Sequence, residues 1–404
     1  ALDVRPAAQS TDVALGEPGA ILTARDVWVG VQVGKVIKPI VQGGRLTVPQ
    51  GGILGLVGES GSGKTQFVRA LMGLSSLEPG VFAGSAVYAI GDQPPVNVLH
   101  QAAEYAPYRP PGPDELFPQR QRIGWAWPLW RRRFRQRLAM LRRLGVGFIF
   151  QNPVGALNPY LRVGTQLMEA VRVARPSASN AEAEEGAIHW LAQVHLKADR
   201  RTLALYPHEL SGGMAQRVMI ALALAGEPKF VVADEPTTGL DSHIRLEIVG
   251  LLNRIMGQGA LSGIVISHDL PMIASLCDRL TVMYRGRVVE EGPIAALGDP
   301  ESPSHPYTRE LKERAEALAR GRQQRTRGGV EKTGGTGVVV GRGCIYRSRC
   351  ALYQNAAVDR GLCETVTPPF DSIAPGHRLA CHAGDATAEY GRLAAVAREA
   401  DSDG

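Results

Sequence analysis

Residues 58–65 form a glycine-rich run that fits the pattern G-x-x-x-x-G-K-[ST]. Glycines let a turn bend tightly and bring its backbone N–H groups close to phosphate oxygens. Lys64 is placed to reach the β- and γ-phosphates of a nucleotide, and the hydroxyl of Thr65 is placed to bind Mg²⁺. An apolar run (53–57) precedes the glycines and a helical pattern follows them, which favours a phosphate-binding loop over a surface turn.

Two adjacent carboxylates follow a second apolar run. Residues 230–233 are typical of a buried strand, and this strand ends at Asp234 and Glu235. Beside a phosphate-binding loop, the first acid is expected to hold Mg²⁺ through water and the second to polarise the attacking water. Alone, the pair would more often be a solvated acid and a helix cap, but the two motifs together predict nucleotide hydrolysis.

A third feature is Ser211-Gly212-Gly213, which precedes an apolar helical run. Ser211 is predicted to cap that helix, and the two glycines expose backbone donors at its positive end. The chain therefore carries two anion sites at helix ends. Two such ends suggest a nucleotide held between two copies of the chain.

These residues need a folded scaffold, and the composition predicts one. The chain has 404 residues, of which 44% are hydrophobic and 21% charged, which allows two or three cores. Such values exclude a disordered tail protein and a disulfide-stapled mini-domain. No long apolar run is present, so no membrane-spanning helix is expected, and residues 1–20 show no signal-peptide pattern.

The pattern along the chain divides it into stretches. We expect a polar tail (1–20), short antiparallel strands (21–57), a helix (65–74), an irregular Pro- and Gly-rich insertion (91–128), a basic helix (128–144), a strand (146–150), a mostly helical region (164–205) and parallel strands (230–233 and 263–267). After residue 300 the pattern loosens, and a charged, then Gly-rich stretch (309–335) leads to a small terminal module.

Six motifs in this order resemble those of ABC ATPases. They are Walker A (58–65), the Q-loop glutamine Gln151, the signature (210–216), Walker B (Asp234 and Glu235), the D-loop (238–241) and the switch histidine His268. The resemblance covers about residues 21–300. It implies an α/β P-loop NTPase cassette with a RecA-like core, an antiparallel β subdomain and a helical subdomain (about 152–215). A basic insertion (about 91–143) and a Cys-containing extension (301–404) complete the implied organisation.

A narrower resemblance is to the dipeptide/oligopeptide importer ATPases, a group that includes nickel and glutathione systems. It rests on residues 151–153, 157–159, 206–214, 234–238 and Ser304-His305-Pro306-Tyr307-Thr308. The implied function is the ATP-hydrolysing subunit that powers uptake of peptides, or a related small solute, by a membrane importer. The implied partners are a second cassette, identical or homologous, two transmembrane permease subunits and an extracytoplasmic substrate-binding protein, with no nucleic acid. The implied location is peripheral, at the cytoplasmic face of the membrane.

This resemblance also implies residue roles, with each ATP between Walker A of one cassette and the signature of the other. The residues implied to bind nucleotide are Gly58, Glu59, Ser60, Gly61, Ser62, Gly63, Lys64, Thr65, Gln66 and Asp234, with Ser211, Gly212 and Gly213 serving the partner's ATP. Glu235 acts as general base or water orienter, and His268 contacts the γ-phosphate. Thr65, Gln151 and Asp234 hold or sense Mg²⁺, Gln151 couples the site to the membrane subunits, and Asp241 joins the two sites.

One position departs from the family pattern, and two rival functions stay open. Val31 stands where members place an aromatic residue on adenine, and Trp28 is predicted on the other strand face. The rivals are a soluble ABC ATPase of DNA repair or translation, and an Fe–S or metal-sensing regulatory protein with a vestigial nucleotide site. The importer motifs argue against the first, and intact Glu235 and His268 argue against the second.

Four of the five cysteines lie in the last quarter of the chain, at Cys344, Cys350, Cys363 and Cys381, whereas Cys277 is expected to be a small buried hydrophobe. Their spacing fits neither zinc ribbons nor bacterial ferredoxins. The cytosolic setting implied by the resemblance disfavours disulfides, which leaves a metal site or free thiols. Because several members of the group carry a [4Fe–4S] cluster on such cysteines, we expect one here, with zinc, and His377 and His382 as possible ligands, as the alternative.

The net charge of +6 is concentrated in one segment. Residues 120–143 carry nine Arg and no acid, so the rest of the chain is mildly acidic. We expect a helix packed on the cassette by Trp130, Phe134, Leu138 and Leu141, with Arg on its solvated faces. The alternatives are contact with the membrane surface or permease subunits, suggested by the position just before Gln151, and a nucleic-acid patch, which no recognised module supports.

Overall fold

The computed structural model of the chain describes residues 16–33, 36–91, 94–100, 102, 127–143, 145–257, 261–298, 302–319 and 342–384. The predicted N-terminal tail, up to residue 15, and most of the predicted insertion (103–126) lie outside the described residues. Within the described residues, no helix is both long and apolar enough to cross a membrane.

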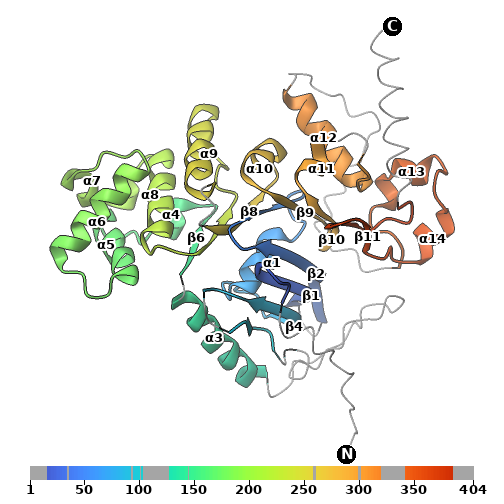
Figure 1. The fold of residues 1–404 in the computed structure, drawn as a ribbon, viewed down its shortest axis with the longest axis horizontal. Coiled ribbons are helices and arrows are strands. Elements are labelled where there is room, and N and C mark those ends of the chain that lie inside the picture. The colour runs from blue at the N-terminus through green and yellow to red at the C-terminus, as the bar shows by residue number, and fades with distance from the viewer. Residues whose placement is uncertain are drawn as a thin grey trace, which may run out of the picture.

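An eight-stranded mixed sheet forms the core, in the order β11-β12-β10-β9-β3-β8-β7-β6 (Figure 1). Its strands are β3 (Ile53–Val57), β6 (Val146–Ile149), β7 (Phe230–Asp234), β8 (Ser262–Ser267), β9 (Arg279–Tyr284), β10 (Arg287–Pro293), β11 (Asp371–Ala374) and β12 (His377–Leu379). The five neighbours from β9 to β6 are parallel. Every residue of β3, β7 and β8 is buried, as expected for parallel strands covered on both faces.

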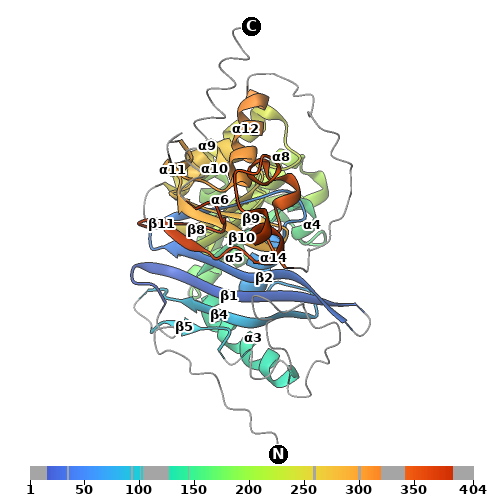
Figure 2. The ribbon, with the colours of Figure 1, turned by 90° about the vertical axis from the view of Figure 1, so that its right-hand side faces the viewer.

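A second, antiparallel sheet packs beneath the core. Its order is β2-β1-β4-β5, formed by β1 (Ala20–Val33), β2 (Val36–Pro49), β4 (Pro79–Tyr88) and β5 (Val96–Asn97). Figure 2 shows these strands as a layer below β8–β10, with most of the helices above. The prediction of antiparallel strands in residues 21–57 is confirmed for β1 and β2, which are 14 residues long rather than short, but was wrong for residues 53–57, which form the parallel strand β3 of the core sheet.

Ten helices precede the C-terminal extension in the described residues. They are α1 (Lys64–Leu71), α3 (Trp127–Arg143), α4 (Pro153–Ala156), α5 (Val163–Ala174), α6 (Asn180–Gln193), α7 (Arg200–Ala204), α8 (Gly212–Ala225), α9 (Ser242–Met256), α10 (Leu270–Leu276) and α11 (Ala295–Gly298), with a 3₁₀ turn at Pro207–Glu209. Of these, α1, α8, α9 and α10 cover the faces of the core sheet. The helices α5–α8 gather at one end of the molecule (Figure 1), so the helical region predicted from the sequence is present.

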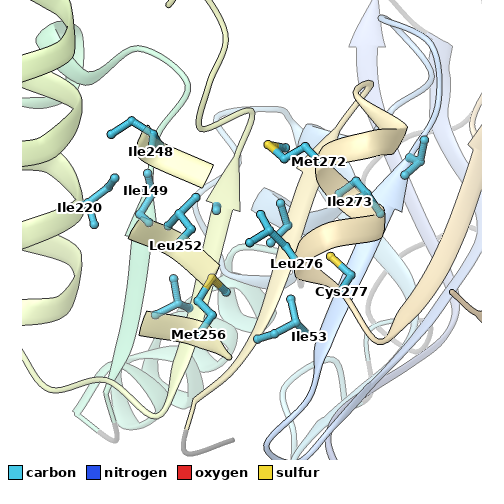
Figure 3. Packing of buried hydrophobic residues seen from close by; sticks show 14 of the residues in the cluster. Ile53, Ile149, Ile220, Ile248, Leu252, Met256, Met272, Ile273, Leu276 and Cys277 are labelled. Atoms are coloured by element: carbon cyan, nitrogen blue, oxygen red, sulfur yellow. The ribbon is translucent and has the colours of Figure 1, made fainter. Parts of the chain in front are cut away.

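Side chains alternate across the strands and divide the interior into two cores. Phe230 and Val232 of β7 face the core that contains α1 and the antiparallel sheet. Val231 and Ala233 face the core built by α8, α9 and α10. Figure 3 shows part of this second core, with the labelled side chains Ile149, Ile220, Ile248 and Leu252 on one side and Ile53, Ile273 and Cys277 on the other. The helices α1 and α8 therefore cover opposite faces of the sheet.

The basic helix α3 packs on the antiparallel sheet. Its apolar side chains Trp130, Phe134 and Leu138 are buried, and Arg131 pairs with Glu78 at 2.7 Å, so the packed interpretation is confirmed. The side chain of Leu141 lies outside the described residues. The strand β6 runs between α3 and Gln151, and its four residues span about 13 Å. Sequence adjacency therefore does not place this helix beside Gln151.

The C-terminal extension is more ordered, and more closely attached, than the sequence predicted. Residues predicted as a loose connection form the helix α12 (Pro306–Ala319). Beyond them lie a 3₁₀ turn (Arg347–Arg349), α13 (Ala351–Gln354), α14 (Arg360–Thr365) and the hairpin β11–β12. In this hairpin β12 pairs with β10, Leu379 opposite Glu290 and Arg378 opposite Glu291. The extension thus continues the core sheet, because the free edge of β10 accepts its strand.

Candidate nucleotide-binding site

The glycine-rich loop connects the central strand β3 to α1, as its sequence context predicted. Gly58 has φ +154° and lies so close to β9 that a Cβ would sit 2.1 Å from the carbonyl oxygen of Met283. Gly63 precedes α1 with φ +99°, a left-handed conformation that side chains rarely adopt. Ser60 and Gly61 are exposed, so the outer part of the loop is open to a ligand. The oxygens Ser62 Oγ and Gln66 Oε1 are buried without a hydrogen-bond partner among the described residues.

Lys64 folds back over its own loop. Its Nζ lies 2.7 Å from the carbonyl oxygen of Gly58 and 3.0 Å from that of Glu59, and the residue is 5% exposed. Burial lowers the pKa of Lys64, while the nearby carboxylates of Glu235, Asp234 and Glu59 act in the opposite direction. An ammonium has three donors, so two carbonyl acceptors leave one donor for a phosphate oxygen.

The two residues predicted to hold Mg²⁺ are in contact. Thr65 Oγ1 donates to Asp234 Oδ1 at 2.8 Å, and Asp234 at the end of β7 is fully buried. Arg69 donates to its other oxygen, Oδ2, at 3.0 Å. Sequence reasoning missed Arg69, although its position four residues after Thr65 places both on one face of α1. A hydroxyl and a carboxylate, with Ser62 and Gln66 oxygens nearby in the chain, are the hard oxygen donors that suit Mg²⁺.

Glu235 and His268 also meet. His268 Nδ1 lies 2.8 Å from Glu235 Oε2 and 3.1 Å from Oε1, and Thr238 Oγ1 donates to Oε2 at 2.9 Å. Glu235 has φ +50°, an uncommon conformation for a non-glycine residue that turns the chain sharply after β7. His268 follows directly after β8, the neighbour of β7 in the sheet. The parallel topology therefore brings together two residues 33 positions apart in the sequence.

The remaining predicted residues lie elsewhere in the fold. Gln151 is exposed directly after β6. Ser211 caps α8 as predicted, accepting from Met214 N at 3.3 Å, and starts a helix on the other face of the sheet from α1. Gly212 is exposed, and Gly213 lies close to Ile244 of α9. Asp241 caps α9 through the N–H groups of His243 and Ile244. Within one chain, the Walker A residues and the signature residues therefore lie at the starts of two different helices, α1 and α8, on opposite faces of the sheet.

The first strand offers no aromatic platform where family members stack adenine. Val31 is half-buried in β1. Trp28 is 7% exposed and belongs to the core that contains the antiparallel sheet, and its indole N–H donates to Asp26 at 3.1 Å. Within β1, Val31 therefore supplies no aromatic ring, and the ring of Trp28 is buried.

The four cysteines of the extension come together as free thiols. Cys344, Cys350 and Cys363 are buried and Cys381 is half-buried, and Cys344 N donates to the carbonyl of Cys363 at 2.8 Å. Burial, and then the neighbouring cysteines, raise the pKa of Cys363 to about 11 and that of Cys381 to about 12. The described residues contain no group of three or more His, Cys, Asp or Glu side chains that could hold a metal ion. The metal site is therefore not confirmed.

Both histidines of the zinc alternative are engaged elsewhere. His377 Nε2 lies 2.9 Å from Glu290 Oε1 in a buried pair, and His382 Nε2 lies 2.9 Å from the carbonyl oxygen of Val366. Cys277 is buried beside Gly55 and Ile273, as expected for a small hydrophobe.

The parallel core sheet, the phosphate-binding loop after its central strand and the Walker B carboxylates define an ABC-type ATPase cassette. The profile of the ABC transporter family matches residues 129–238. The fold is also similar to the ATP-binding cassette MJ0796 in a dimeric post-hydrolysis state with ADP and Pi (TM-score 0.52, 23% identity, 68% of this chain and 98% of that chain).

Two relatives show which group of ABC ATPases the chain belongs to. The chain is 34% identical over 336 residues to the oligopeptide transport ATP-binding protein OppD of Salmonella typhimurium, covering 83% of this chain and 85% of the relative. It is also 34% identical over 341 residues to the dipeptide transport ATP-binding protein DppD of Escherichia coli, covering 83% and 88%. The chain therefore belongs to the family of ATP-binding proteins of peptide ABC importers, and it is an ATPase. The predicted family, fold class and activity are confirmed, and the DNA-repair or translation alternative is not favoured.

Proposed function

We propose that residues 58–66 bind ATP with Mg²⁺ and that a second cassette, identical or homologous, completes the site with its own signature. The observation that carries this proposal is the convergence of Lys64, the Thr65–Asp234 pair and the Glu235–His268 pair around one loop. The position of α8 on the opposite face of the sheet supports head-to-tail pairing. In such a pair, Ser211, Gly212 and Gly213 would serve the partner's nucleotide, and Asp241 would join the two sites.

Each residue at the site has a chemical task in this proposal. Lys64 donates a hydrogen bond from its third N–H to a phosphate oxygen, and the backbone N–H groups of the loop donate to the other phosphate oxygens. Thr65 and Asp234 hold Mg²⁺, with Gln151 arriving from β6, and the ion would neutralise phosphate charge. Glu235 orients the attacking water and accepts its proton, while His268 fixes the Glu235 carboxylate and can reach the γ-phosphate side.

We propose that the energy of hydrolysis drives uptake of peptides or a related small solute. Relatives named for oligopeptide and dipeptide transport support this cargo. Two permease subunits and an extracytoplasmic substrate-binding protein would then be the partners, and the chain would sit at the cytoplasmic face of the membrane. Gln151, exposed after β6, would link the nucleotide to the permease subunits.

We propose that Cys344, Cys350, Cys363 and Cys381 hold a [4Fe–4S] cluster, with zinc as the alternative. Their support is the donor set itself, four free thiols that lie near enough to one another to interact electrostatically. ATP hydrolysis needs no electrons, so a structural or regulatory role follows.

The proposed function is tested on the full chain co-expressed with its two permease subunits. We expect the three to purify together, to hydrolyse ATP, and to lose turnover but keep ATP binding in the Glu235→Gln variant. Equal, negligible hydrolysis by wild type and variant in the assembled complex would disprove the enzymatic role. A homodimer that binds DNA and ignores the permeases would disprove the importer role.

A further inference from the structure

The phosphate-binding loop is held from outside by the C-terminal extension, at Glu59. Arg349 grips the Glu59 carboxylate with both terminal nitrogens, at 3.0 Å and 2.9 Å. Arg314 of α12 adds a third contact at 3.1 Å. Bidentate guanidinium–carboxylate pairs are directional and strong, so they fix the position of both partners. Although burial alone would raise it, the pKa of Glu59 is lowered because Arg349 and Arg314 favour the carboxylate.

The backbone of Glu59 is fixed as well. Its N–H donates to the hydroxyl oxygen of Tyr307, at the start of α12, at 2.7 Å. Its carbonyl oxygen accepts from Lys64 Nζ at 3.0 Å. The extension therefore contacts Glu59, and Glu59 in turn orients Lys64, so a single residue connects the extension to the lysine of the loop.

Arg349 is itself held rigidly. Its guanidinium lies over the rings of Tyr284, Tyr307 and Tyr346, between 5.7 and 5.9 Å from their centroids. It also donates to Glu310 Oε1 at 2.6 Å, and Tyr346 donates to the other oxygen of Glu310 at 2.6 Å. Its side chain is 19% exposed. An arginine enclosed by three rings and two carboxylates has little rotamer freedom left, so it acts as a fixed anchor.

We propose that Arg349 is a positioning residue for the phosphate-binding loop, and that it sets the affinity of this chain for ATP by fixing Glu59 and, through it, Lys64. The proposal rests on the proposed ATP site. Arg349 ends the 3₁₀ turn that directly precedes Cys350, so the cysteine-bearing part of the extension and the nucleotide loop share this anchor. The loop needs preorganised donors, and a freed Glu59 would let Lys64 and the first turn of the loop relax before ATP binds.

The test measures the Kd for ATP, in the presence of Mg²⁺, and the kcat of the full chain in its permease complex. Arg349→Met and Glu59→Gln are each expected to raise Kd about tenfold, and for Arg349→Met kcat at saturating ATP should stay within about twofold of wild type. Because both remove one contact, the double variant should bind no more weakly than Arg349→Met alone. Arg349→Lys, which keeps the charge but loses the bidentate fork, should fall between wild type and Arg349→Met.

Arg360→Met is the matched control, because Arg360 lies in the same extension but donates to the carbonyls of Tyr353 and Gln354. Its Kd should match wild type. If Arg349→Met does not fold, the Kd for ATP is measured on Glu59→Gln, which lies in the half-buried loop, and on Tyr307→Phe. Variants that lower the melting temperature but bind ATP like wild type would overturn the proposal, and so would additive effects in the double variant. If wild type fails to bind ATP, the proposed function falls too, whereas equal binding by all variants sinks the positioning role alone.

Discussion

His268 Nδ1 lies 2.8 Å from Oε2 of Glu235, so the two side chains just beyond neighbouring parallel strands meet at the phosphate loop. The contact holds a half-buried carboxylate in one orientation, with Thr238 bonded to the same oxygen. A base that must line up with one water molecule depends on such a fixed orientation.

Replacing His268 by Ala is therefore expected to lower kcat by about 100-fold or more, since general-base catalysis contributes at least that much. Affinity for ATP should change by no more than a few-fold, because Lys64 and the loop backbone remain. Single-turnover hydrolysis and ATP titration measure the two effects separately. His189→Ala, at an exposed position of α6, is the control. Turnover within twofold of wild type in His268→Ala would contradict this role for the contact.

Gly58→Ala is expected to destabilise the fold by about 2 kcal/mol or more, and to weaken ATP binding. A Cβ at this position would lie 2.1 Å from a backbone oxygen of β9, which cannot turn away as a side chain can. Gly250→Ala is the matched control, since Gly250 lies in α9 with open space around its Cβ position. Denaturant unfolding should show the control stabilised by about 0.5–1 kcal/mol. Similar unfolding midpoints for both variants would refute the steric account.

Cys344→Ser is expected to abolish the brown absorbance that the proposed cluster would give, in protein purified without oxygen. Cys277→Ser should leave the absorbance unchanged, because Cys277 is buried beside Gly55 and Ile273, whereas Cys344 lies near the three other cysteines of the extension. Metal analysis of both variants completes the measurement. Stoichiometric zinc without iron in wild type would decide against the cluster.

Acid should destabilise the chain through His305. This side chain is 1% exposed beside Tyr346, it accepts from Tyr307 N, and burial lowers its pKa to about 3. The unfolded chain binds a proton near pH 6.5 that the folded chain does not. The contribution of His305 to the free energy of unfolding is therefore fully present above about pH 6.5 and falls by about 1.4 kcal/mol per pH unit below it.

The measurement for His305 is the free energy of unfolding between pH 7 and pH 5, compared with His305→Gln. The glutamine variant keeps a donor and an acceptor but does not titrate, so its stability should decline less steeply with acid. His189→Gln should decline like wild type. Identical slopes for wild type and His305→Gln would show that His305 does not carry this dependence.

Much of the site could be predicted because its residues form motifs of consecutive or near-consecutive positions. A phosphate loop needs particular residue types in consecutive positions, and strand β7 places Asp234 and Glu235 by its own apolar pattern. The contacts of Glu59 could not be predicted, since its partners Tyr307 and Arg349 lie 248 and 290 positions away. The motif at residues 304–308 could be recognised from its resemblance to the importer ATPases. No rule of sequence spacing, however, predicts that the Tyr307 hydroxyl reaches the phosphate-binding loop. The packing of α3 could be predicted from the spacing of its apolar residues, but its distance from Gln151 could not, because β6 separates these sequence neighbours in space.

The pairing of β12 with β10 has a consequence for how the chain can be shortened. Glu290 and Glu291 of β10 pair with Leu379 and Arg378 along an edge that would otherwise be open. A variant truncated before the hairpin would expose unpaired backbone on β10, and such edges recruit strands from other molecules. We therefore expect the extension to protect the ATPase core from self-association, and a minimal cassette cut from this chain to be prone to aggregate.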